Sequence, residues 1–242
     1  MASVTKYTRG AVYGHIAHDM RSLSSGQYTN PDIDLTRSEA NYAVVDRPDP
    51  WAHYKDRLRE LHVYNRKDVV HAAEWTITAP VELTPEQQKA FFMASADFLN
   101  NRYGEKNCIC AVVHHDEKNR AQGHMHYMFM PTISDKKHGG EKLCANAVLN
   151  KRELRVFHDD FQKHLDGHGI KARVKTGAVA AGQGGRNYSV EELKQGVRER
   201  DLLDRNIELT RQIEHSRERA PERGNRYGNT QERERGNRYG RR

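Results

Sequence analysis

The sequence predicts an α+β protein in which helices flank a largely antiparallel central sheet. Strand-like and helix-like segments follow one another without the regular βαβ repeat that marks a parallel sheet. Residues 107–114 and 124–131 are apolar on both faces, as is typical of central strands that are covered on both sides. The 242 residues suit one domain of about 150 to 200 residues with appendages.

The first third of the chain contains two helix-like segments and one strand. Residues 11–22 and 50–62 are compatible with helices, although Gly14 is an unfavourable residue inside the first of them. Residues 73–79 alternate between polar and apolar side chains, as a half-buried strand does. This alternation places Glu74 on the polar face of that strand.

Two further helices have explicit start signals. Thr84 is a candidate N-cap, followed directly by a proline and, at the third helical position, by Gln87. Asn150 opens the second helix, and Gly169 is its expected stop. The apolar stripe of this second helix comprises Leu154, Phe157, Phe161 and Leu165.

The last quarter of the chain differs in composition from the rest. We expect residues 1–175 to form the main domain, 176–188 a flexible glycine-rich linker, and 189–216 a helix that begins with a Ser-x-x-Glu capping box. Residues 217–242 contain a seven-residue Glu-Arg-Gly-Asn-Arg-Tyr-Gly unit twice, at a spacing of twelve. This tail has no hydrophobic periodicity, so we expect it to be disordered.

The net charge of +7 is concentrated in the tail. Residues 217–242 hold nine arginines against four glutamates, which accounts for five of the seven charges. A basic balance indicates a polyanionic partner, and arginine interleaved with tyrosine suits a single-stranded nucleic acid. The alternative is a tail that only adds solubility.

Other features of the composition exclude several classes of protein. No window approaches the roughly 18 apolar residues of a membrane helix, and the N-terminus lacks a secretory leader, so we expect a soluble cytoplasmic protein. Three cysteines without CxxC spacing predict buried thiols rather than a disulfide framework. By strand alternation, Cys108 and Cys110 share the face of His114.

Three histidines are predicted to converge on one face of the central sheet. His124 and His126 lie two residues apart in one strand and therefore share a face. If the strand that ends at His114 is the antiparallel hairpin neighbour, His114 lies opposite this pair. Three neutral imidazoles are a common ligand set for a divalent transition metal, so we expect a metal site here. Glu117, just beyond the strand, is a candidate fourth ligand, orienting residue or base.

This histidine segment is similar to the metal motif of the plasmid mobilisation and recombination relaxases, the Mob/Pre family within the His-hydrophobic-His single-strand endonucleases. The resemblance covers about residues 10–170. It includes Arg37-Ser38 with Asn41-Tyr42, Arg66-Lys67-Asp68 with Glu74-Trp75, Phe91-Phe92 through Tyr103-Gly104, His114 to Glu117, and Arg152-Glu153-Leu154 with Asp166 to Gly169. The link from Glu117 to His124 is longer than the family pattern, and the C-terminal helical region is shorter.

The resemblance implies an enzyme that nicks one strand of a plasmid transfer origin and stays attached to the 5′ phosphate, with Mn²⁺ or Mg²⁺ as the metal. This branch is expected to use a histidine nucleophile. The matching position is His18, with Arg21 three residues later, and His15 is its nearest rival. The implied partners are origin DNA, supercoiled or single-stranded, and other relaxosome or coupling proteins.

The expected chemistry assigns further roles. A nucleophilic His18 needs an acceptor for its second ring nitrogen, and Glu74 and Glu117 are the candidates. Arg21 and Arg37 are candidate phosphate clamps by charge and by motif position. The residues expected to contact DNA are Arg21, Arg37, Asn41, Tyr42 and Arg66.

Three other functions are consistent with parts of this pattern. A rolling-circle replication initiator or a transposase would use a tyrosine, for which Tyr7, Tyr13 and Tyr28 are available. A DNA-binding mobilisation accessory protein would use the metal for stability and would not cleave. A small-molecule metallohydrolase fits the three histidines but leaves the basic tail unexplained.

Overall fold

The computed structural model describes residues 2–23, 28, 30–117 and 122–174, together with four single positions near the C-terminus. The chain divides into two compact units, Met1–Asn187 and Tyr188–Arg242, and the fold below is that of the first. In the second unit the four described positions are helical: Gln195, Leu202, Arg205 and Glu208. The expected linker 176–188, the remainder of the expected helix 189–216 and the tail 217–242 lie outside the described residues.

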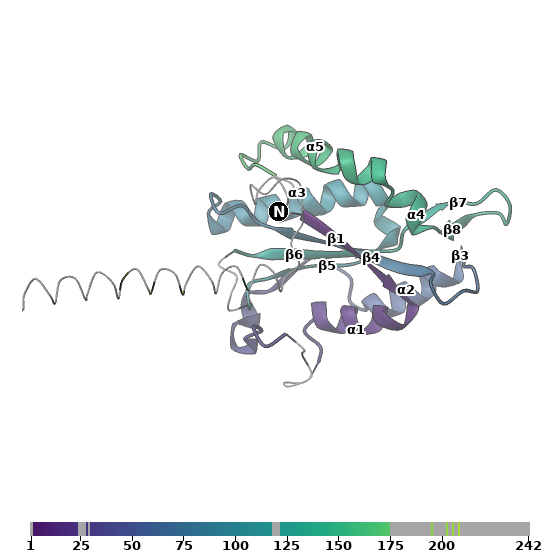
Figure 1. Cartoon of the computed structure of the whole chain (residues 1–242), viewed down its shortest axis with the longest axis horizontal. Coiled ribbons are helices and arrows are strands. Elements are labelled where there is room, and N and C mark those ends of the chain that lie inside the picture. The colour runs from purple at the N-terminus through teal and green to yellow at the C-terminus, as the bar shows by residue number, and fades with distance from the viewer. Residues whose placement is uncertain are drawn as a thin grey trace, which may run out of the picture. The chain divides into compact units, whose positions relative to one another are not determined.

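A five-stranded antiparallel sheet forms the centre of the first unit (Figure 1). Every neighbouring pair of its strands is antiparallel, which confirms the predicted fold class. The strands, in their order across the sheet, are β1 (Ala2–Thr8), β4 (Val70–Thr78), β6 (His124–Phe129), β5 (Cys108–His114) and β2 (Tyr42–Val45). The two segments that the sequence predicts as central strands, β5 and β6, are interior neighbours.

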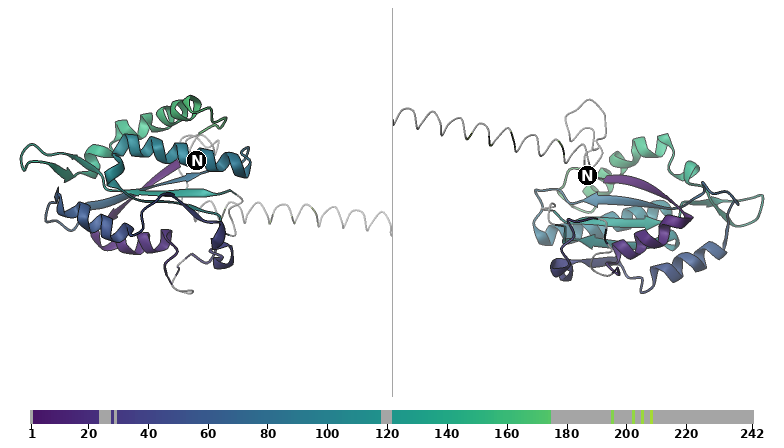
Figure 2. Two further views of the ribbon diagram at one scale, coloured as in Figure 1. Left: turned by 180° about the vertical axis from the view of Figure 1, so that it is seen from behind. Right: turned by 60° about the horizontal axis from the view of Figure 1, so that its bottom comes forward.

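Helices cover both faces of this sheet (Figures 1 and 2). On one face lie α3 (Pro85–Tyr103) and α5 (Lys151–Gly167). On the other lie α1 (Arg9–Asp19) and α2 (Pro50–Arg59). The remaining helical segments are the 3₁₀ turns Leu35–Ala40 and Glu105–Asn107 and the short α4 (Ala145–Val148).

A small second sheet lies at one end of the unit, at the right in Figure 1. Its strand order is β3-β8-β7, formed by Leu61–His62, Glu141–Leu143 and Thr132–Ser134. This sheet corrects the predicted helix 50–62, because α2 ends at Arg59 and the next residues pair in parallel with β8.

The other predicted helices form with adjusted boundaries. The predicted helix 11–22 is α1, which ends at Asp19 because the backbone of Arg21 is left-handed with φ +51°. Thr84 and Gln87 form the predicted capping box of α3. The side chain of Asn150 caps α5.

The core has one apolar layer on each side of the sheet. Between the sheet and α3 and α5, Trp75 stacks on Phe157 with ring centroids 3.7 Å apart. Two predictions about these layers are wrong. Leu154 is 40% exposed, because at the start of α5 it is the side chain of Glu153, and not that of Leu154, that faces Arg102 of α3. Cys108 packs in the α3 layer, since a register shift before Cys110 breaks the strand alternation.

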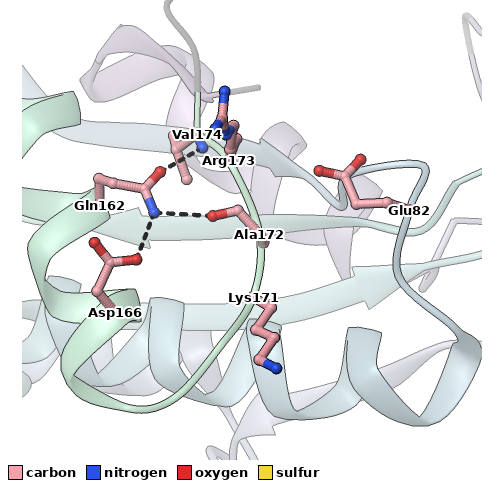
Figure 3. A pocket seen from close by; sticks show the side chains of 7 residues that line it. All are labelled: Glu82, Gln162, Asp166, Lys171, Ala172, Arg173 and Val174. Carbon is pink, nitrogen blue, oxygen red and sulfur yellow. Dashed lines mark hydrogen bonds between the residues drawn. The ribbon is translucent and has the colours of Figure 1, made fainter.

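The chain after α5 folds back along that helix (Figure 3). The Gln162 amide donates hydrogen bonds to the Ala172 carbonyl and to Asp166, and it accepts one from the Val174 N–H. The hollow beside this turn is lined by Glu82, Gln162, Asp166, Lys171, Ala172, Arg173 and Val174. None of the residues predicted to act on DNA or metal lines it. In the described part of the chain, no helix has the length and apolar character needed to span a membrane.

Candidate metal centre and active site

Three histidines meet on the face of the sheet that α1 covers. The pairing of β5 with β6 puts His114 opposite His124 and Val112 opposite His126, which confirms the predicted cross-strand arrangement. The ring centroid of His126 lies 4.8 Å from that of His114 and 5.0 Å from that of His124. One potential ligand atom from each of the three imidazoles and from Glu117 lies within 4.8 Å of the other three.

Two of these imidazoles are oriented as metal ligands are. Nε2 of His114 lies 2.7 Å from the Asp19 carbonyl oxygen, and Nδ1 of His126 lies 2.7 Å from Oε1 of Glu74. A nitrogen that faces a carbonyl or a carboxylate carries the proton, so the opposite nitrogen keeps its lone pair. Among the described residues, these opposite nitrogens, Nδ1 of His114 and Nε2 of His126, are buried without a hydrogen-bond partner. The donor set therefore fits a divalent metal ion.

Asp19 is a site residue that no sequence pattern assigned. Its side chain is 1% exposed, and Oδ1 lies 3.5 Å from Nδ1 of His126, while its carbonyl orients His114. Burial raises the pKa of Asp19 well above its usual value, and the neighbouring Glu74 raises it further. An acidic residue in the last turn of a helix opposes the helix dipole, and this anomaly in α1 is the signal that could have identified it.

Glu74, one of the two candidate acceptors for His18, is engaged by a histidine of the cluster. Its carboxylate accepts a hydrogen bond from His126 across the β4–β6 pair. Burial opposes ionisation of Glu74, yet the His126 hydrogen bond outweighs it and holds the pKa below its ordinary value. Glu74 thus orients a candidate metal ligand.

His18 lies beside the histidine cluster. Its ring centroid is 6.4 Å from that of His126 and 5.9 Å from that of Tyr28. Burial lowers the pKa of His18 to about 4, and the nearby Arg21 charge adds to this, so the ring is neutral at pH 7. The rival His15 instead stacks on Tyr7, with ring centroids 3.8 Å apart.

Asp116 connects three segments of the site and also had no predicted role. Arg21 binds its carboxylate with two 2.8 Å hydrogen bonds, and Ser38 and Asn41 each donate one of 2.7 Å. Burial acts to raise the pKa of Asp116, but these hydrogen bonds outweigh it and hold the pKa well below its ordinary value. The Arg-Ser-x-x-Asn-Tyr segment is therefore anchored to the end of β5.

The residues expected to contact DNA fall in different surroundings. The side chain of Arg21 is 7% exposed and is occupied by Asp116 and by the His18 carbonyl. Arg37 is exposed and donates a hydrogen bond to the His115 carbonyl. Asn41 is bound to Asp116 and to the His115 N–H, and Tyr42 is half-buried, with its ring stacked 6.1 Å from that of His115.

Arg66 lies in a different part of the surface. Its guanidinium is 5.9 Å from the Tyr64 ring. It lines a basic hollow together with Arg9, Lys55, Arg59 and Lys67. We call this surface the basic hollow. It combines these cationic groups with the aromatic ring of Tyr64.

The three tyrosines considered as nucleophiles also differ. Tyr7 is buried, and burial raises its pKa well above the ordinary value. Tyr13 is 56% exposed and packs edge-on against Trp51. Tyr28 lies next to His18, and its hydroxyl accepts a hydrogen bond from the Leu23 N–H.

The central strands of this antiparallel sheet carry a His-x-His pair and a third histidine, and helices cover both faces of the sheet. These features define this chain as a protein with the relaxase-domain fold. The family model described as plasmid recombination enzyme, Mob_Pre, matches residues 1–179. The chain belongs to this family.

Two curated relatives and one solved structure illustrate the similarity. A plasmid recombination enzyme of Streptococcus agalactiae is 28% identical over 219 residues, which cover 86% of this chain and 41% of the relative. One from a Bacillus species is 34% identical over 159 residues, 61% of this chain and 35% of the relative. The chain thus spans less than half the length of these relatives. The manganese-bound MobM relaxase domain, in complex with plasmid pMV158 oriT DNA, matches with a TM-score of 0.65 and 28% identity over 81% of this chain and 97% of that domain.

Proposed function

We propose that this chain is a metal-dependent relaxase, which nicks one strand of a plasmid transfer origin and links the 5′ phosphate to His18. The observation that carries the proposal is the position of His18, a neutral imidazole beside the three-histidine cluster. The fold supports it, because the similar MobM domain is a relaxase bound to oriT DNA and manganese.

His114, His124 and His126 would hold the divalent cation, with Glu117 as the fourth ligand. When bound, the cation would stabilise negative charge on the scissile phosphate. Three imidazoles favour Mn²⁺ or a later transition metal over Mg²⁺. Glu74 and the Asp19 carbonyl would keep His126 and His114 in their ligating orientations.

His18 would act through the lone pair of a ring nitrogen. As the P–N bond forms, the bond from phosphorus to the 3′ oxygen breaks. The imidazole ring of His18 loses one proton and the 3′ oxygen gains one to become a hydroxyl, so the step is balanced. Because the pKa of His18 is about 4, no proton has to be removed before attack at neutral pH. Attack by a 3′ hydroxyl on the same phosphorus would reverse the step and rejoin a strand.

Arg21 and Asp116 would position this nucleophile. Asp116 holds the Arg21 guanidinium at two points, and Nη1 of Arg21 donates a 2.8 Å hydrogen bond to the His18 carbonyl. The end of α1 is thereby fixed to the end of β5. Arg21 would contribute to DNA binding through this arrangement, whereas Arg37, which is exposed, would contact a phosphate directly.

The basic hollow would bind a further part of the DNA strand. Its cationic side chains suit phosphates, and Tyr64 offers a ring on which a base can stack. We propose residues 1–175 as the domain that selects and cuts DNA. The arginine-rich residues 217–242 would add affinity that does not depend on sequence.

A nicking assay with the full chain tests this function. The substrate is a supercoiled plasmid that carries the coding region with its flanking DNA, incubated with Mn²⁺ or with a chelator. We expect a metal-dependent nick and a protein-linked 5′ end that is acid-labile, as a phosphoramidate is. His18→Ala should remove the adduct, and Tyr28→Phe should retain it.

Other outcomes would support the alternative functions. An acid-stable adduct that persists in His18→Ala and disappears in Tyr28→Phe would indicate a tyrosine enzyme, such as a replication initiator or a transposase. Binding of the plasmid segment without metal-dependent nicking would indicate an accessory protein.

A further inference from the structure

A second cluster of metal-ligating side chains lies on the opposite side of the sheet from the three histidines. Asp97 belongs to α3, and His164 and His168 lie one helical turn apart at the C-terminal end of α5. Their ligand atoms all lie within 4.8 Å of one another. Because α3 and α5 cover the face opposite α1, the sheet separates this cluster from the candidate active site (Figure 1).

Both imidazoles are held by backbone groups. Nδ1 of His168 lies 2.8 Å from the His164 carbonyl oxygen, and the His164 ring hydrogen-bonds to the backbone of Ala94. Within the described part of the chain, Nε2 of His164 is buried without a hydrogen-bond partner. A ring nitrogen that faces a carbonyl carries the proton, so Nε2 of His168 keeps its lone pair.

These two nitrogens converge on one carboxylate oxygen. Oδ2 of Asp97 lies 3.4 Å from Nε2 of His164 and 3.8 Å from Nε2 of His168. A divalent cation between these three atoms would accept a lone pair from each of them.

The donor set selects a class of cation. Two imidazole nitrogens and one carboxylate oxygen are typical ligands of Zn²⁺, which would complete a tetrahedral site with water. The same set binds late divalent transition metals more strongly than Mn²⁺. Backbone carbonyls that fix both imidazoles are the outer partners that such ligands usually have.

A third cluster, His62 with Asp135 and His138, brings its ligand atoms equally close, but its carboxylate is already engaged. Nδ1 of His138 lies 2.6 Å from Oδ2 of Asp135. Lys142 already places its ammonium 3.4 Å from Asp135. His138 therefore serves as a matched control, an exposed imidazole next to a carboxylate.

We propose that Asp97, His164 and His168 form a second, structural metal site for a late transition metal such as Zn²⁺, which fastens the C-terminal end of α5 to α3. The site is independent of the proposed DNA chemistry. It would hold the end of α5, where the chain turns back along the helix through Gln162.

Zinc titration of the metal-free full chain tests this site. Equilibrium dialysis gives the bound equivalents and their affinities, and thermal unfolding gives the change in Tm with Zn²⁺. We expect His168→Ala and Asp97→Asn each to lose one equivalent, or to weaken its Kd at least about tenfold, and to lose part of the Zn²⁺-induced rise in Tm. His138→Ala should retain the parent stoichiometry and Tm shift.

Two further measurements separate this site from the candidate active site. His126→Ala should keep the equivalent that His168→Ala removes, and His168→Ala should nick DNA in Mn²⁺ at the parent rate. In the parent chain, Zn²⁺ should shift the imidazole NMR signals of His164 and His168. Unchanged zinc binding in His168→Ala, or loss of the equivalent in His138→Ala instead, would overturn the proposal.

Discussion

At the scale of single residues, a buried carboxylate at the end of β5 decides how His18 is presented. Asp116 is fully buried and holds Arg21, whose backbone lies in the left-handed region at φ +51°. Such a conformation costs about 1 to 3 kcal/mol in a residue other than glycine and persists only where contacts enforce it. The two-point Arg21–Asp116 pair is that contact.

Asp116→Asn should therefore be strongly destabilising. It removes the charge of the carboxylate that binds the 7% exposed guanidinium of Arg21 at two points, and leaves Glu117, 3.6 Å away, as the remaining charge partner. Breaking a buried pair costs about 3 to 5 kcal/mol. Urea unfolding measures the loss. Arg37→Ala, at an exposed arginine three residues after Asp34, the N-cap of the 3₁₀ turn Leu35–Ala40, should cost less than about 1 kcal/mol. A similar small cost for Asp116→Asn would contradict the role of the pair.

Glu74→Gln tests the orientation of His126. The amide oxygen can still accept the hydrogen bond, but the charge that strengthens it is lost. We expect the affinity for Mn²⁺ to fall about 10- to 100-fold, as isothermal titration calorimetry would measure. Glu86→Gln, at an exposed carboxylate, is the control. Equal affinities for the two variants would show that Glu74 does not support a metal ligand.

His18 should make stability depend on pH. Its folded pKa of about 4 lies below its unfolded value of about 6.5, so the unfolded chain binds more protons between these limits. The contribution of His18 to the free energy of unfolding is therefore fully present above about pH 6.5, and it is lost as the pH falls toward about 4. In His18→Asn, the slope of unfolding free energy against pH should be smaller by up to about one proton. Identical slopes in urea titrations of the metal-free chain would argue against a buried neutral ring.

At the scale of elements, local sequence signals placed the four longer helices and the interior strands β4, β5 and β6, but not the ends of the helices or the other five strands. The capping box of α3 and the two apolar strands β5 and β6 were predictable, because each depends on neighbouring residues. The ends of α1 and α2 were not. Arg21 leaves the helix to reach Asp116, and the residues after α2 join a strand that is formed about eighty residues later.

The stripe of α5 gives a matched pair of substitutions. Phe157 is fully buried against Trp75, so Phe157→Ala should cost about 3 to 5 kcal/mol. Leu154 is 40% exposed on the same helix, and Leu154→Ala should cost less than about 1 kcal/mol. Denaturant unfolding of the two variants compares them directly. Similar costs would mean that the packing of α5 differs from that described.

At the scale of the whole molecule, the charge is unevenly divided along the chain. Residues 217–242 carry five of the seven net positive charges. Deleting them should reduce the salt dependence of single-strand binding, by up to about 6 in the log–log slope if all nine arginines contact phosphates. Fluorescence anisotropy at a series of salt concentrations measures this slope. An unchanged slope would show that the tail does not bind nucleic acid.

The sequence by itself determined the fold class, the convergence of His114, His124 and His126, and the family. These conclusions rest on strand alternation, hairpin pairing and motifs, which are local properties of the chain. Only the tertiary structure decided which acid serves which histidine. Glu74 reaches His126 across the β4–β6 pair, and Asp19 reaches His114 through the docking of α1 on the sheet, at a separation of 95 residues. Such contacts depend on strand register and helix docking, which no local pattern encodes.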